Sequence, residues 1–179
     1  HERGGAYLDV RTGVVFYGDT PRPTYTYTSP DGRYSLYAPN RAPLQLTDGN
    51  TQAITDIPRD GIGGNFTQVR WIGTEVRLLN RDAEYQGVYA VDLDAPTPQL
   101  QTRVRLTTPV SDIRGAHISP AGSRLLVTLT TGESTVFALD QGDVIFQQQL
   151  DTDDATYAWL GDDALLYAVD GCLHRVTLS

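Results

Sequence analysis

The chain has 179 residues, which is enough for one domain with its own hydrophobic core. Its formal net charge is −8, and its fourteen basic residues are all scattered arginines, so nucleic acid is excluded as the expected partner. No apolar run reaches the roughly 18 residues of a membrane-spanning helix, so we expect no transmembrane segment within the chain.

The predicted elements begin with a hairpin over residues 5–19, "GAYLDVRTGVVFYGD". A turn with the sequence "SPDG" follows at Ser29, and an apolar run, "RYSLYAP", comes directly after it. The next stretch, "PLQLTDGNTQAITDI", contains two more apolar runs on either side of an Asp-Gly-Asn turn. Glycine supplies the positive φ that a tight hairpin turn needs, so this stretch is predicted to be two antiparallel strands.

The same outline recurs three times further along the chain. The turns are in "WIGTEVRLLN" from Trp71, "SPAGSRLLVTL" from Ser119 and "WLGDDALLYA" from Trp159. The strands "GVYAVDLDA", "STVFALDQG" and "CLHRVTLS" then occupy equivalent third places. The residues that precede the four turns are Thr28, Trp71, Ile118 and Trp159, and their spacings are 43, 47 and 41 residues.

A period of 40–47 residues with four short strands in each unit is typical of β-propeller blades. The units are residues 24–57, 68–106, 114–150 and 155–179 of a single propeller-type domain, and the hairpin completes or precedes a blade. Sheets covered on both faces account for nearly continuous apolar strands such as "RLLVTL", and no stretch keeps a helical apolar period. The predicted fold is therefore all-β: a propeller or partial propeller of about four four-stranded antiparallel blades plus an N-terminal hairpin.

The segments "YTYTSPDGRYSLYAP" and "AHISPAGSRLLVTL" resemble the SPDG-type blades of TolB-like propellers and of the propeller domains of prolyl-oligopeptidase relatives. The resemblance covers about 150 residues, from roughly Thr24 onward. The second and fourth units lack the Ser-Pro pair, and Ala121 replaces the usual aspartate of the third. The resemblance implies a propeller fold and an extracytoplasmic location, periplasmic or secreted, with tethering to a membrane by a further segment as an alternative. It implies no single activity, because propellers serve many functions.

The candidate binding residues come from loops on one face of the predicted propeller and from the strands that enter its centre. Arginine and tyrosine are favoured at protein interfaces, although ordinary surface arginines are the simpler interpretation. Arg70 and His117 each precede the last residue before a turn, which places them in the same phase near the central channel. The full set of predicted binding residues is Arg59, Arg70, Arg81, Tyr85, Arg114 and His117.

No catalytic residue, metal site or cofactor is predicted. Cys172, the single cysteine, is interpreted as a small core residue at the start of a strand rather than a nucleophile. The acidic segment "DTDDATYAWLGDD" lacks the spacing of a calcium loop and is interpreted as a solvated turn. A remote alternative is a copper site at His1, completed by His117 or His174.

The predicted function is that of a non-catalytic protein-interaction or scaffold module, whose partner is another protein or the remainder of a larger chain. The alternative is the accessory propeller domain of a hydrolase. We also expect Trp71 and Trp159 to occupy equivalent, mostly buried positions. Because the fourth unit stops after its third strand, the N-terminal hairpin is expected to add to the strand at Cys172, or one of these open edges to pack against another polypeptide.

Overall fold

Four antiparallel sheets make up most of the molecule, in agreement with the predicted fold class. The computed structural model describes residues 6–9, 14–17, 26–39, 42–82, 86–149, 156–169 and 171–178. These residues contain no α-helix; a single 3₁₀ turn, η1, covers Val110–Asp112. They also contain no helix that is long and apolar enough to cross a membrane.

Each sheet is a simple meander in which sequential strands are hydrogen-bonded neighbours. The hairpin consists of β1 (Ala6–Asp9) and β2 (Val14–Tyr17). The first sheet contains β3 (Thr26–Thr28), β4 (Tyr34–Tyr37), β5 (Leu44–Asp48) and β6 (Ile54–Ile57). The second contains β7 (Phe66–Ile72), β8 (Glu75–Asn80), β9 (Gly87–Asp92) and β10 (Gln101–Arg105). The third contains β11 (Ile113–Ile118), β12 (Arg124–Leu129), β13 (Glu133–Ala138) and β14 (Val144–Gln149). The fourth contains β15 (Thr156–Trp159), β16 (Ala164–Val169) and β17 (Cys172–Thr177).

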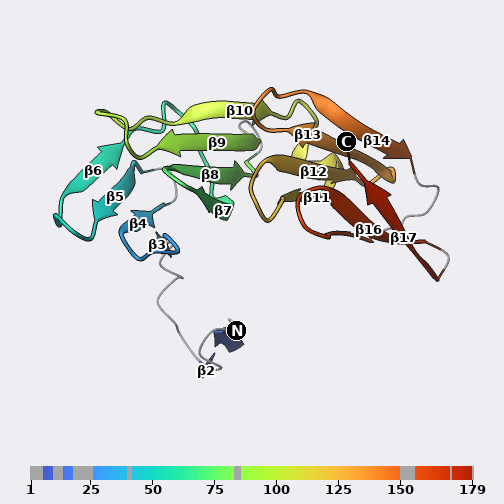
Figure 1. Cartoon of the computed structure of the whole chain (residues 1–179), viewed down its shortest axis with the longest axis horizontal. Helices are drawn as coiled ribbons and strands as arrows, with labels where there is room; N and C mark the ends of the chain where they lie inside the picture. The colour runs from blue at the N-terminus through green and yellow to red at the C-terminus, as the bar shows by residue number, and fades with distance from the viewer. Residues whose placement is uncertain are drawn as a thin grey trace.

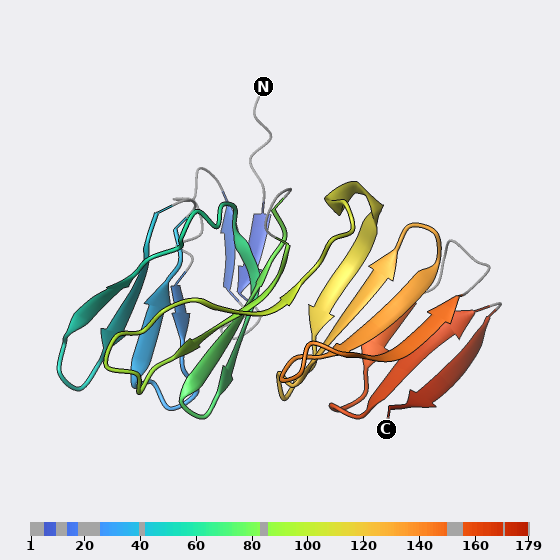
Figure 2. The ribbon, with the colours of Figure 1, turned by 90° about the horizontal axis from the view of Figure 1, so that it is seen from above.

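The sheets follow one another in chain order from one end of the molecule to the other (Figures 1 and 2). In the second and third sheets, the first strands β7 and β11 lie on one side of the row, and the last strands β10 and β14 lie on the other (Figure 1). Strands β7 and β11 also contact each other directly. The first strands therefore form the inner side of the row.

The residues predicted to precede each turn occupy the same place in every sheet. Each of them pairs with the second residue of the next strand, which confirms the register of the repeat. The pairs are Thr28 with Ser35, Trp71 with Val76, Ile118 with Leu125 and Trp159 with Leu165. The two tryptophans are thus equivalent, but both are half-buried rather than mostly buried, because the first strands lie at the exposed inner edge of their sheets.

The two Ser-Pro turns share one hydrogen-bond pattern. In the first turn, Gly32 N–H donates to Ser29 O at 2.9 Å, and Tyr34 N–H donates to Ser29 Oγ at 2.8 Å. In the third sheet, Gly122 N–H donates to Ser119 O at 2.9 Å, and Arg124 N–H donates to Ser119 Oγ at 3.1 Å. Gly32 and Gly122 have φ values of 73° and 80°, a left-handed conformation that favours glycine. The turn sequence therefore fixes the entry into the second strand of each sheet.

The hydrophobic core is divided into three layers, one at each junction between sheets. The first layer joins Leu36 and Leu46 of the first sheet to Val76 and Leu78 of the second. Alternate residues of β8 face opposite junctions: Leu78 belongs to the first layer and Leu79 to the next. Covering both faces of the inner sheets confirms the explanation for their nearly continuous apolar strands.

The fourth sheet ends at an open edge. Among the described strands, β17 pairs only with β16, and β1 pairs only with β2, so the expected addition of the N-terminal hairpin to the Cys172 strand is wrong. Cys172 begins a strand, as predicted. The prediction that its side chain lies in the core is wrong: the side chain is exposed, because β17 is the outermost strand of the last sheet.

Candidate binding site on the first strands

A glutamine that was not among the predicted site residues ties β7 to β11. Gln68 Oε1 accepts a hydrogen bond from Ile118 N–H at 2.9 Å, and Gln68 Nε2 donates to Ala116 O at 3.1 Å. Its amide thus satisfies the open backbone edge of β11 much as another strand would. Two bonds of opposite sense also fix which end of the amide carries the nitrogen. The sequence indicates only an amide side chain within a predicted strand. It does not reveal a hydrogen-bond partner about 50 residues away.

His117 lies beside this amide in its neutral form. Gln68 Nε2 is 3.0 Å from His117 Nδ1, so Nδ1 is the acceptor and the ring proton is on Nε2. Partial desolvation lowers the pKa of His117, and the positive charges of Arg81 and Arg70 lower it further. The carbonyl of His117 accepts a hydrogen bond from Trp159 Nε1 at 3.2 Å. The residue is therefore positioned by the sheets on both sides of its own.

Arg70 and Arg81 supply two positive charges next to this histidine. Arg70 Nη1 donates to Val69 O at 3.1 Å, and Arg81 Nη2 donates to Ile113 O at 3.1 Å, so backbone carbonyls hold both guanidinium groups. Both side chains are half-buried. The ion pairs found among the described residues involve Arg33, Arg77 and Arg103 and neither of these two arginines. The structure thus brings together Arg70, Arg81 and His117, three of the predicted residues.

The other predicted residues have different environments. Arg59 is 6% exposed: Nη1 donates to Gly64 O at 2.8 Å, and the guanidinium lies over the ring of Phe66 at 4.8 Å. Burial lowers the pKa of Arg59, and its contacts give it a structural place inside the molecule. Arg114 is exposed on β11, the strand that also carries His117. Tyr85 lies outside the described residues.

The copper alternative depends on His1 and on one of two histidines that lie in different sheets. His1 lies outside the described residues. His174 belongs to the fourth sheet, where its ring stacks on Tyr167 with 5.0 Å between centroids, whereas His117 belongs to the third sheet. Within the described part of the chain, no group of three or more His, Cys, Asp or Glu residues is placed to hold a metal ion.

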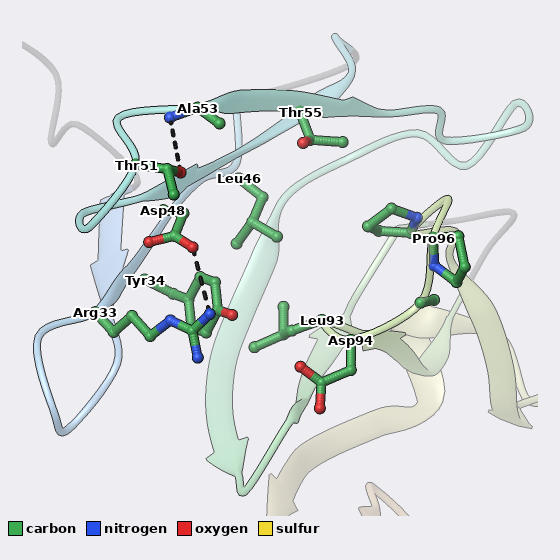
Figure 3. A pocket seen from close by; sticks show the side chains of 12 residues that line it. Arg33, Tyr34, Leu46, Asp48, Thr51, Ala53, Thr55, Leu93, Asp94 and Pro96 are labelled. Atoms are coloured by element: carbon green, nitrogen blue, oxygen red, sulfur yellow. Dashed lines mark hydrogen bonds and ion pairs between the residues drawn. The ribbon is translucent and has the colours of Figure 1, made fainter.

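A cavity of about 360 Å³ lies between the first sheet and the segment that follows β9. Leu46 and Leu93 face the space from its two sides, and Pro96 lies at its far end (Figure 3). The Arg33–Asp48 ion pair, 3.4 Å long, borders the cavity (Figure 3). Two of its three charged lining residues, Arg33 and Asp48, are thus paired with each other, which leaves Asp94 as its remaining charge. The cluster of Arg70, Arg81 and His117 is the stronger candidate for a binding site.

No family model matches this sequence, and no curated protein matches it. Solved structures do resemble it. A chain of the mitotic checkpoint complex matches with 15% identity and a TM-score of 0.53, over 92% of this chain and 51% of that one. Hsv2 of Kluyveromyces lactis matches with 16% identity and a TM-score of 0.52, over 86% and 60%. The chain has the β-propeller fold.

These two β-propellers are of the WD40 type, and the present chain spans about half the length of the mitotic checkpoint protein that it matches. The computationally designed protein Ika4 is similar in extent: 89% of this chain matches 94% of Ika4, with 14% identity and a TM-score of 0.54. At these identities the likeness establishes the fold alone. The four sheets are therefore propeller blades, and the first strands line the inner side of an arc.

Proposed function

We propose that the chain is a single propeller-type domain that acts as a non-catalytic interaction module and binds an acidic segment of a partner protein. The proposed site consists of Arg70, Arg81, Arg114 and His117. The observation that carries the proposal is the gathering of Arg70 and Arg81 at one neutral histidine, with no ion pair to either arginine among the described residues. In a chain of net charge −8, such a cluster is a local exception that attracts carboxylates.

The chemistry of the cluster suits a carboxylate. Arginine presents a planar fork of N–H donors that can bind both oxygens of one carboxylate. Because Gln68 occupies Nδ1 of His117, the Nε2–H of that ring is the donor that a ligand can use. The backbone carbonyls that accept bonds from Arg70 and Arg81 hold the two guanidinium groups in place before binding, which reduces the ordering cost.

A titration with a fluorescent oligoglutamate peptide tests this function. We expect Arg70→Gln and Arg81→Gln each to weaken binding roughly threefold to fivefold, the effect of losing one partly exposed charge pair, and added salt to weaken binding to the unsubstituted chain. Arg33→Gln is the matched control, because it removes the same charge from a residue outside the cluster. Equal losses in all three variants would show that net charge, and not this site, binds the peptide.

The finer assignment, an SPDG-type, TolB-like propeller in an extracytoplasmic protein, is also a proposal. The shared hydrogen bonds of the turns at Ser29 and Ser119 support the repeat type. The location is supported only by the resemblance of the sequence. Secretion of the protein from its native cell, measured by fractionation, tests that location independently of peptide binding.

A further inference from the structure

The sheets at the two ends of the arc each have one face that no other described sheet covers. In the fourth sheet, Leu165 and Tyr167 of β16 face the third sheet: Leu165 belongs to the core layer there, and Tyr167 Oη accepts a hydrogen bond from Gln148 at 3.3 Å. The alternate residues Leu166 and Ala168 are therefore on the opposite face. We call this opposite face the tail face; it also includes Leu173 and Arg175, which pair with Ala168 and Leu166.

The tail face is apolar and accessible. Leu173 is 71% exposed, and Leu160, which alternates with the inward-facing Trp159, is 44% exposed. Leu166 is half-buried and Ala168 is exposed. Arg175 is an exposed charge on the same face. An apolar surface with one charge at its side is typical of a protein interface rather than of a solvated end sheet.

The first sheet has the complementary uncovered face, which we call the head face. Leu36 and Leu46 point into the core, so Tyr37 of β4 and Ile54 and Asp56 of β6 alternate to the head face. Tyr37 is 39% exposed and Ile54 is 66% exposed. Four of the five exposed large hydrophobic residues in the described ranges thus lie on the head and tail faces, as Tyr37, Ile54, Leu160 and Leu173. Asp56 offers the head face a charge opposite to that of Arg175.

The junctions inside the arc show how two such faces meet. At each junction, the face of one sheet that is equivalent to the tail face packs on the face of the next sheet that is equivalent to the head face. Trp71, Ile118 and Trp159 contact the preceding sheet in this way, whereas their counterpart Thr28 on the head face is exposed. Arginines span these junctions: Arg77 donates to Gly122 O of the next sheet at 2.8 Å. The head face therefore corresponds to the face that a preceding sheet covers at the other junctions, and no described sheet covers it.

We propose that a second copy of this chain covers both faces, with the tail face of each copy on the head face of the other. Two arcs joined in this way form a closed ring with two equal junctions and no exposed end sheet. The four sheets correspond to about half of a ring, because the match covers 51% of the mitotic checkpoint chain. The two faces carry opposite charges, with Arg175 on the tail face and Asp56 on the head face. This association uses surfaces separate from Arg70, Arg81 and His117.

Sedimentation velocity of the full chain at about 1–100 µM tests the proposal. We expect a dimer, and we expect Leu173→Asp on the tail face and Ile54→Asp on the head face each to increase the dimer dissociation constant at least tenfold. Mixing these two variants should restore a heterodimer, because it retains one unaltered junction. Val144→Asp is the matched control: Val144 is 52% exposed but lies on β14 of the third sheet, so its dimer should persist.

Several results would overturn the proposal. A monomer at 100 µM would show that a second copy does not cover these faces. A dimer lost only in Leu173→Asp would show tail-to-tail packing, and growth of large assemblies with concentration would show that the ring does not close. Circular dichroism verifies the fold of each variant, and Leu160→Asp replaces Leu173→Asp if that variant unfolds. Oligoglutamate binding is measured on the same samples, so failure of the dimer and failure of the proposed function are separate outcomes.

Discussion

Replacing Ala121 by aspartate restores the full Ser-Pro-Asp-Gly sequence of the third turn, yet we predict that it destabilises the protein. In the first turn, the Asp31 carboxylate accepts hydrogen bonds from Ser29 Oγ at 2.6 Å and Arg33 N–H at 3.1 Å, and these bonds lower the pKa of Asp31. The third turn uses the carboxylate of the next sheet instead: Asp162 Oδ1 accepts from Ala121 N–H at 3.2 Å.

The magnitude follows from the competition between the two carboxylates. Ser123 Oγ also donates to Asp162, so this carboxylate occupies the space beside residue 121. Two carboxylates about 5 Å apart in partly exposed surroundings repel each other by roughly 1–2 kcal/mol, and the bridge from the third to the fourth sheet weakens as well. The new local bonds of an aspartate at position 121 return about 1 kcal/mol. We expect a net loss of about 1 kcal/mol.

Urea denaturation measures the effect. Ala121→Ser is the control, since it adds a polar group without charge and should change the free energy of unfolding by less than about 0.5 kcal/mol. Combining Ala121→Asp with Asp162→Asn should recover most of the loss, because the repulsion is removed. A gain in stability from Ala121→Asp alone, unaffected by Asp162→Asn, would refute the idea that the neighbouring sheet completes this turn.

Two further predictions concern the junctions. Arg77 is 6% exposed and donates to Gly122 O and, at 2.6 Å, to Asp140. Arg77→Met should therefore lower the free energy of unfolding in urea by about 2–3 kcal/mol, whereas Arg33→Met, at an exposed ion pair, should lower it by less than about 0.5 kcal/mol. Similar losses in both variants would contradict the role of burial. The pKa of His117 is lower in the folded protein than in the unfolded chain, so the unfolded chain binds more protons. The protein should therefore lose stability as the pH falls through the ordinary histidine pKa of about 6.5 towards the lower folded pKa. His117→Asn should reduce the difference in stability between pH 7.5 and pH 5.5, and an unchanged difference would exclude this residue as a source.

The repeat and its register could be predicted because their determinants are local. A Ser-Pro turn or a Trp followed by a tight turn, and then an apolar run, specifies two strands and the residue at which they pair. The pairing of Trp71 with Val76 and of Trp159 with Leu165 follows from those few residues. The phase argument for Arg70 and His117 was equally local, and the charge of Arg70 does act on His117.

The contacts between sheets could not be predicted in the same way, because each joins residues about 40–60 positions apart. Nothing near Gln68 in the sequence indicates that its amide will satisfy the backbone of β11. The sequence predicts a solvated turn around Asp162, whereas the carboxylate of this residue completes a turn in the preceding sheet. Arg59 is a different case, because its partners are closer in the sequence. Loop position alone predicts a binding surface for it, but the carbonyls of Gly64 and Pro39 and the ring of Phe66 hold its guanidinium inside.

The division of the core into three separate layers makes the sheets a series of coupled units. Each layer joins only two neighbouring sheets, so the stability of the whole resembles a sum of sheet and junction terms, and opening can begin at either end. Amide hydrogen exchange should then be slowest in β8 and β12 and fastest in the end sheets, because local opening starts there. Small rotations at the three junctions also add along the series. The distance between the first and fourth sheets is consequently the dimension of the molecule that changes most easily. Any molecule that binds both end sheets at once sets the curvature of the arc.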